Sequence, residues 1–130
     1  MTESAEVSRR AASYITQILG VPEALAYPLL HMQGSPLQHQ AHTLRKLTVR
    51  RLRLLDRVAV NAETLAADLT TQAAHAREGR QPRPVSYEPL SESTALTARI
   101  TELDDILVEL ACDLTEAARV SGLLPVQEPV

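Results

Sequence analysis

The sequence has 130 residues, of which 45% are apolar, 22% charged and 2% aromatic, and its formal net charge is −3. This length supports one hydrophobic core, and the high apolar fraction excludes a disordered chain. Leu and Ala, which favour helices, occupy 20 and 18 positions, whereas Phe and Trp are absent. Sheets favour β-branched and aromatic residues. The composition therefore predicts an all-α protein.

The cysteine content and the lengths of the apolar stretches indicate in which cellular compartment the protein lies. A single cysteine, Cys112, cannot build a disulfide framework. The acidic, polar start of the sequence is unlike a secretory signal, and no stretch approaches the roughly 20 apolar residues that span a bilayer. We expect a cytoplasmic protein without membrane contact. Twelve of the thirteen basic residues are Arg, a bias typical of high-GC bacterial or phage genomes.

Glycine and proline divide the N-terminal region, residues 1–34, into two short helices. The first is predicted from about residue 4 to residue 19 and ends at Gly20. The second opens at Pro22, because proline is tolerated in the first helical turn. We expect it to bend or end near Pro28, where a proline removes a backbone donor. Gly34 closes the region.

The turn between these helices has a recognisable pattern. Residues 15–26 read Ile-Thr-Gln-Ile-Leu-Gly-Val-Pro-Glu-Ala-Leu-Ala and resemble a helix-turn-helix motif, with a Leu-Gly-Val turn and apolar residues at fitting offsets. The resemblance covers about 20 residues and implies a DNA-binding regulator. The sequence departs from the motif at Pro28, inside the recognition helix, and that helix has no basic residue for a phosphate.

A long helical hairpin is predicted for the rest of the chain. Ser35 and Pro36 resemble an N-cap and a first helical position, and residues 37–78 contain neither Gly nor Pro. Within region 35–79 we therefore expect one helix of about 63 Å, ended by Gly79. Residues 80–93, with three prolines, form the connector. A second helix spans residues 94–121, and Gly122 suits a Schellman ending before the tail, residues 122–130. All of residues 1–130 form one helical domain.

The second of these helices has the a/d repeat of a coiled coil, with alternating spacings of four and three residues: Leu96, Ile100, Leu103, Leu107, Leu110, Leu114 and Ala117. The first has a matching seam: Leu52, Leu55, Ala59, Ala62, Ala66, Leu69, Ala73 and Ala76. Leucines facing alanines allow a close approach. We expect an antiparallel hairpin with Ala76 beside Leu96 and Ala62 beside Leu110, and with the N-terminal helices packed at its open end.

The long helix also has a second apolar stripe, displaced by one residue, which needs another neighbour. The N-terminal helices can cover part of this stripe. The remainder, Leu47, Leu54, Val58 and Leu65, is predicted to be a self-association surface. A homo-oligomer would then complete the bundle.

Catalytic signatures are lacking. The four glycines lie far apart, so the sequence has no phosphate-binding loop, and no Glu-x-x-His repeat of a di-iron bundle occurs. His39 and His42 lie three residues apart with His31 upstream, but no Cys or carboxylate follows nearby as a further ligand. Cys112 has acidic neighbours in the sequence, which disfavour a reactive thiolate. The carboxylates of the last helix flank an apolar seam, a position typical of solvated or paired charges and not of an acid–base pair. We expect no catalytic site, metal or cofactor.

Charge is segregated along the sequence. Residues 43–57 contain six basic residues and one acid, whereas residues 92–116 contain seven acids and one Arg. Lys46, Arg50, Arg53 and Arg57 follow helical spacing and are called the cationic stripe. In the expected register Arg57 lies near Asp113 and Glu116.

The partner of this stripe is either protein or nucleic acid. Arginine binds carboxylates and phosphates alike. The isoelectric point near 5.8 and the scarcity of aromatic residues favour an acidic protein surface over nucleic acid. The sequence therefore predicts a non-enzymatic helical adaptor or assembly subunit that binds itself and another protein. The alternative is a nucleic-acid-associated protein, which uses the cationic stripe or the N-terminal helix-turn-helix.

Overall fold

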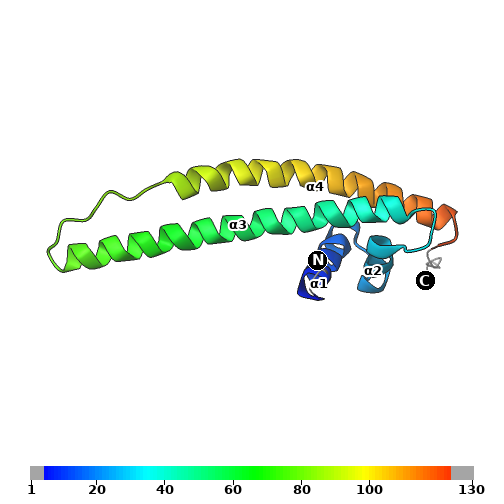
Figure 1. Ribbon diagram of the computed structural model, residues 1–130, viewed down its shortest axis with the longest axis horizontal. Coiled ribbons are helices and arrows are strands. Elements are labelled where there is room, and N and C mark those ends of the chain that lie inside the picture. The colour runs from blue at the N-terminus through cyan, green and yellow to red at the C-terminus, as the bar shows by residue number, and fades with distance from the viewer. Residues whose placement is uncertain (1–4, 124–130) are drawn as a thin grey trace. The chain divides into compact units, whose positions relative to one another are not determined.

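The computed structural model describes residues 5–123, which form four helices and no strand (Figure 1). They are α1 (Ala5–Leu19), α2 (Glu23–His31), α3 (Gln38–Arg77) and α4 (Glu88–Val120). The chain divides into two compact units: residues up to 52 with those from 102 onwards, and residues 53–101. Within each unit α3 pairs with α4, through Arg51 and Asp104 in the first and through Arg57 and Glu92 in the second. The all-α hairpin is confirmed, and the single domain of residues 1–130 stays a prediction.

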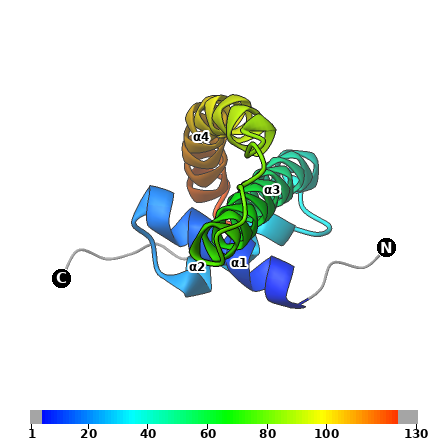
Figure 2. The ribbon, with the colours of Figure 1, turned by 90° about the vertical axis from the view of Figure 1, so that its left-hand side faces the viewer.

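The first unit has a core made by all four helices. Segments of α3 and α4 pack with α1 and α2, which lie together beneath them in Figure 2. The fully buried side chains include Ile15 of α1, Leu29 of α2, Leu44 of α3 and Leu107 of α4. Ala11 and Ile15, which lie four residues apart on one side of α1, are both buried, so this side of α1 faces the core.

The second helix contains Pro28, the residue near which we expect it to bend or end. It continues to His31 with Pro28 inside it, and the Met32 amide donates to the Pro28 carbonyl over 3.0 Å. A proline within a helix leaves the carbonyl four residues earlier without its donor. Here that residue is Ala24, which is exposed, so solvent can replace the lost bond. The helix therefore continues past Pro28 and ends at His31, three residues later.

The ends of the long helices follow the expected capping. The Ser35 hydroxyl accepts a bond from the Leu37 amide, which satisfies one donor before α3 begins. Gly79 (φ +77°) and Gly122 (φ +69°) adopt the left-handed conformation that favours glycine. After each of them an amide donates back to the carbonyl five residues earlier, as in a Schellman motif: Arg80 to His75, and Leu123 to Ala118. The predicted tail, beyond residue 123, lies outside the described residues.

The connector is shorter than predicted, because α4 begins at Glu88 instead of residue 94. Pro89 lies in the first turn of α4, where a helix loses no hydrogen bond to a proline. Only Pro82 and Pro84 belong to the connector itself. Three nearby prolines therefore suggested a longer loop than the chain forms.

The register of the hairpin also differs. In the second unit the Asn61 amide lies 3.3 Å from the Glu92 carboxylate, and the Arg83 backbone amide donates to Gln72 Oε1 over 2.6 Å. The connector thus runs back along α3 before α4 begins. An extended chain rises about 3.1 Å per residue, roughly twice the 1.5 Å of a helix. A short extended connector therefore runs past several turns of α3, and α4 begins opposite an earlier part of α3 than a tight turn would give. The expected pairing of Ala76 with Leu96 is wrong.

The face of α3 that is buried in the second unit also differs from the expected one. Asn61 is buried, and Val58 and Leu65 are half-buried, so this part of the second stripe faces inward. The expected seam is exposed there, at Ala59, Ala62, Ala66, Leu69, Ala73 and Ala76. The seam of α4 is confirmed, because all of its members are buried or half-buried. Among the described helices, none is long and apolar enough to cross a membrane.

Candidate interaction surfaces

The cationic stripe lies on the exposed side of α3. Lys46 and Arg50 belong to the first unit, Arg53 and Arg57 belong to the second, and all four are exposed. Within the described part of the chain, no hydrogen bond or ion pair involves Lys46, Arg50 or Arg53. Three cations of the stripe are therefore available to a partner.

Arg57 has a different acidic partner from the one expected. Its Nε donates to Glu92 Oε1 over 2.6 Å, and Glu92 replaces Asp113 and Glu116 in this role. The hydrogen bond from Arg57, followed by that from Asn61, lowers the pKa of the Glu92 carboxyl. The same bond from Glu92 raises the pKa of the Arg57 guanidinium. The pair joins α3 to α4 within the second unit.

The four residues expected to mediate self-association are all half-buried within their own chain. Leu47 packs against the core of the first unit. Val58 and Leu65 line a groove in the second unit, and Leu54 lies on the same stripe of α3. Their role in self-association stays a prediction.

The groove in the second unit is apolar. It has a volume of about 290 Å³ and lies between α3 and the start of α4, with Val58, Leu65, Leu69, Pro89 and Leu90 among its lining residues. Leu69 is 46% exposed and Leu90 is 53% exposed. Large apolar side chains exposed around a groove are typical of a contact surface for another helix.

Sequence reasoning missed a polar cluster in the first unit. The Tyr14 hydroxyl and Arg51 Nε both donate to Asp104 Oδ1 over 2.5 Å, and the Arg51 guanidinium lies 4.1 Å from the Tyr14 ring centroid. Burial, followed by the bond to Asp104, raises the pKa of the Tyr14 phenol, which keeps its proton as a donor. In the sequence, Arg51 stands between Leu47 and Leu54 at the spacing of the second apolar stripe, and this interruption was the signal. The cluster joins α1, α3 and α4.

Two hollows lie in the first unit. One, of about 580 Å³, is beside the polar cluster and is lined by Arg9, Arg51 and Glu23 among others. The other, of about 480 Å³, lies where the α2–α3 loop meets α3, and three histidines line it with Arg45. Both are large enough for a small ligand.

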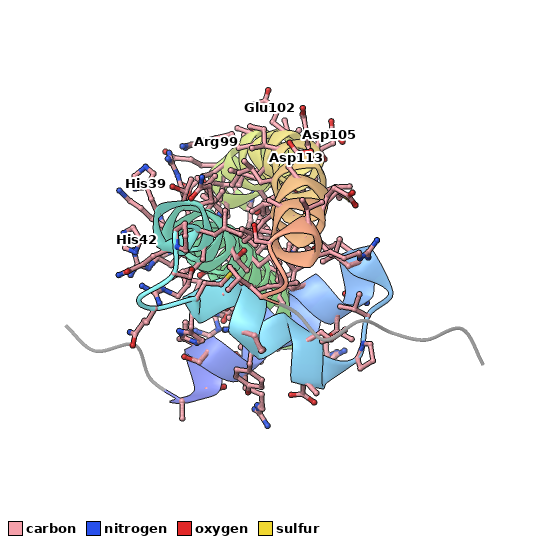
Figure 3. All side chains as sticks on the ribbon, turned by 90° about the vertical axis from the view of Figure 1, so that its right-hand side faces the viewer. His39, His42, Arg99, Glu102, Asp105 and Asp113 are labelled. Carbon is pink, nitrogen blue, oxygen red and sulfur yellow. The ribbon has the colours of Figure 1, made fainter. Side chains whose placement is uncertain are left out.

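The side chains considered for metal or acid–base chemistry do not converge. Among the described residues no three His, Cys, Asp or Glu side chains form a possible metal site, so His39 and His42 have no third ligand of these types. In Figure 3 His39 and His42 project from α3, whereas Glu102, Asp105 and Asp113 project from α4 into solvent. Cys112 is exposed. The carboxylates form an exposed acidic surface of α4.

The helix-turn-helix resemblance corresponds to α1, α2 and the turn at Gly20. Ala26, Leu29 and Leu30 of α2 are buried in the core, and its exposed side contains Glu23, Ala24, Tyr27 and Pro28. No Lys or Arg occurs in α2, so its exposed side has no guanidinium or ammonium group to contact a phosphate.

Comparisons with protein-family models, curated proteins and solved structures found no match.

Proposed function

We propose that this protein is a non-enzymatic helical adaptor or assembly subunit that acts through contacts with a second copy and with another protein. Its location would be the cytoplasm, which fits a chain whose one cysteine is an exposed free thiol. The proposal includes no cofactor.

The apolar groove of the second unit is the observation that carries this proposal. Burying Leu69 and Leu90 against an apolar partner would remove their side chains from water. The favourable free energy of this burial is about 25 cal/mol for each Å² of apolar surface covered. The groove runs between helices, and its residues include Val58 and Leu65 of the predicted self-association surface. An amphipathic helix, from a second copy or another protein, is the partner that such a groove fits.

Substitutions that place negative charge on the rim of the groove test this proposal. We expect Leu69→Glu together with Leu90→Glu to lower the mass in solution of the full chain, because carboxylates at the contact would have to be desolvated. Light scattering at about 100 μM protein, well above a dissociation constant of about 1 μM, measures this mass. Circular dichroism reports whether the helices remain.

Val60→Glu is the matched control. Val60 lies on α3, is 48% exposed and does not line the groove, so this change adds one carboxylate, half of the charge that the double variant adds, at a similar exposure. It should leave the mass unchanged. A wild-type protein that is a monomer in this measurement would contradict self-association, and an equal effect of Val60→Glu would remove the groove from the proposal.

A nucleic-acid-associated protein is the second candidate. The exposure of Lys46, Arg50 and Arg53, without an ion-pair partner in the described residues, favours it. Phosphate contacts need such cations. The cationic stripe supports this alternative better than α2 does, because α2 has no basic side chain apart from His31.

A further inference from the structure

We propose that the helix which occupies the apolar groove of the second unit is α3 of a second copy, packed antiparallel against α3 of the first. The contact runs along the alanine seam, which consists of Ala59, Ala62, Ala66, Leu69, Ala73 and Ala76. All six residues are exposed, and Ala62, Ala66 and Leu69 also line the groove. The groove and the alanine seam therefore form one continuous surface. The inference rests on the self-association proposed above and gives it a partner segment and a register.

The second unit has few buried apolar side chains of its own. Among residues 53–101 only Leu96 and Ile100 are buried apolar residues, and the large core cluster contains no residue of this range. A helix with two apolar stripes needs more than one neighbour. A third helix in the groove would cover Leu69 and Leu90. Since each copy has the same deficit, two copies can supply this helix to each other.

The alanine seam has the spacing of a coiled-coil contact. Its members alternate by three and four residues over about 26 Å of helix. In the second unit α4 packs on the neighbouring stripe, where Val58 and Leu65 are half-buried, and leaves the alanine seam exposed. Small side chains let the backbones of two helices approach closely. A regular repeat that the chain does not use itself is thus available to another helix.

This seam is complementary to itself when the second copy runs antiparallel. Ala66 then lies opposite Leu69 of the second copy, Ala62 opposite its Ala73, and Ala59 opposite its Ala76. Each pair occurs twice, because a two-fold axis relates the copies. Both leucines face an alanine, so a large side chain meets a small one. A shift by one heptad in either direction would leave two of the six residues without an opposite member.

The charges beside the alanine seam favour the antiparallel direction. Asp56, Glu63 and Arg77 are spaced by multiples of seven residues, so they flank the seam on one side, and all are exposed. Asp56 has a further interaction in its own chain, whereas Glu63 and Arg77 have no partner among the described residues. An antiparallel pair brings Arg77 of each copy to the acidic end of the other. A parallel pair would instead place Arg77 level with Arg77 and Glu63 level with Glu63, without this complementarity.

Cross-linking tests the register. In a Cys112→Ser background, which removes the exposed native thiol, we expect Ala62→Cys with Ala73→Cys to give a disulfide-linked dimer of the full chain. The two positions are about 16 Å apart along one helix, too far for a disulfide within a chain. Oxidation in a glutathione buffer at about 20 μM protein, followed by a non-reducing gel and peptide mass spectrometry, measures the product.

Two cysteine controls use the same helix. Ala62→Cys with Ala74→Cys moves one thiol by a single position to an exposed residue that faces away from the alanine seam. It should form the linked dimer at most about one tenth as fast, because the thiols are no longer opposed. Ala62→Cys alone should also fail to link, since residue 62 lies far from its own copy in an antiparallel pair.

A charge in the alanine seam tests the contact without a thiol. Ala66→Glu should raise the Kd of the dimer at least about tenfold, because the contact would have to desolvate a carboxylate. Ala67→Glu is the matched control, because Ala67 is an exposed alanine at the next position and does not line the groove. It should change the Kd less than about twofold. Light scattering over a range of concentrations gives the Kd, and circular dichroism checks that the helices remain.

The possible failures can be told apart. An oligomer that forms without the link between positions 62 and 73, that Ala66→Glu and Ala67→Glu weaken equally, or that Ala62→Cys alone links efficiently would overturn the antiparallel alanine seam and leave the proposed self-association standing. A wild-type chain that stays a monomer up to about 100 μM would overturn both. A linked dimer in the Ala62→Cys, Ala73→Cys variant only, together with a weakened dimer in Ala66→Glu only, is the result that we expect.

Discussion

Arg51 and Arg53 stand two positions apart on α3 and have different surroundings. Arg51 is half-buried, donates to Asp104 and stacks over the Tyr14 ring. Arg53 is exposed and has no partner among the residues that the structure describes. Neighbouring positions of a helix face different directions, so an interior arginine and a surface arginine can be close in sequence. The first stabilises the fold, and the second is available for binding.

Asp104 should contribute more to stability than its neighbour. Asp104→Ala removes the acceptor of both the buried Tyr14 and the half-buried Arg51 and leaves their two donors unpaired, which should cost about 1–2 kcal/mol after allowance for partial exposure. Asp105→Ala, at an exposed position of α4, is the control and should cost little. Urea denaturation followed by circular dichroism measures both. Equal losses would show that the cluster does not join the helices.

Glu92 should titrate below the usual range of a glutamate. Its lowered pKa means that the Arg57–Glu92 pair stabilises the second unit above the unfolded value of about 4.3, and that this contribution is lost as the pH falls through the lower folded value. Arg57→Gln should raise the midpoint of the Glu92 carboxyl in a ¹³C NMR titration. Arg53→Gln should not. An unchanged midpoint in Arg57→Gln would contradict the pair.

At the scale of the helix, α4 shows what a regular repeat determines. Its a/d seam alternates spacings of four and three residues, and every member is buried or half-buried. The seam serves both units, although α4 has α1 and α2 as additional neighbours in the core of the first unit only. In α4 the repeat, whose members are nearly all large apolar residues, therefore marks the inward face in both units.

Leu107 lies at the centre of this seam and is fully buried. Leu107→Ala should lower the free energy of unfolding by about 2–5 kcal/mol, the cost of a cavity at a buried leucine. Glu109→Ala, at an exposed position two residues later, should change it little. Chemical denaturation of the two variants compares them. Similar midpoints would mean that α4 is rotated from the orientation described.

At the scale of the whole molecule, the segregation of charge is the main feature. Residues 43–57 have a net charge of +5 and residues 92–116 a net charge of −6, while the whole chain is at −3. Within the first unit, exposed cations of α3 and exposed carboxylates of α4 occur together. A second copy of the chain therefore offers complementary charge, which raises association rates and selects partners more than it raises affinity.

The cationic stripe distinguishes the two candidate functions. If it binds acidic helices, changing Lys46, Arg50, Arg53 and Arg57 to Gln should reduce the mass in solution, while nucleic-acid binding stays at background; this is the result we expect. If it binds phosphates, each single change should lower the salt dependence of nucleic-acid binding by about one. Light scattering and fluorescence anisotropy measure the two effects. Binding of generic duplex DNA with Kd below about 1 μM at 150 mM salt, abolished by the quadruple change, would reverse the order of the candidates.

The sequence alone determined the helices and many of their ends. Leucine and alanine content predicts helices, and the isolated glycines mark their ends, because Gly79 and Gly122 adopt a backbone conformation that other residues rarely take. The inward faces of α1 and α4 also follow from local periodicity. The cationic stripe could be located by helical spacing, and its exposure agrees with that prediction.

Only the tertiary structure decided which face of α3 meets α4, in what register, and which side chains converge. Either of the two apolar stripes of α3 could pack against α4. Because the leucines of α4 match the alanines of the first stripe, the sequence favoured that stripe, which is exposed in the second unit. In that unit polar contacts favour the other face of α3, because Asn61 donates to Glu92 and Gln72 accepts from the backbone of the connector. The hollow at Arg45 likewise joins residues of α2, a loop and α3. Such contacts depend on distances through space between separate elements, whereas periodicity describes one element at a time.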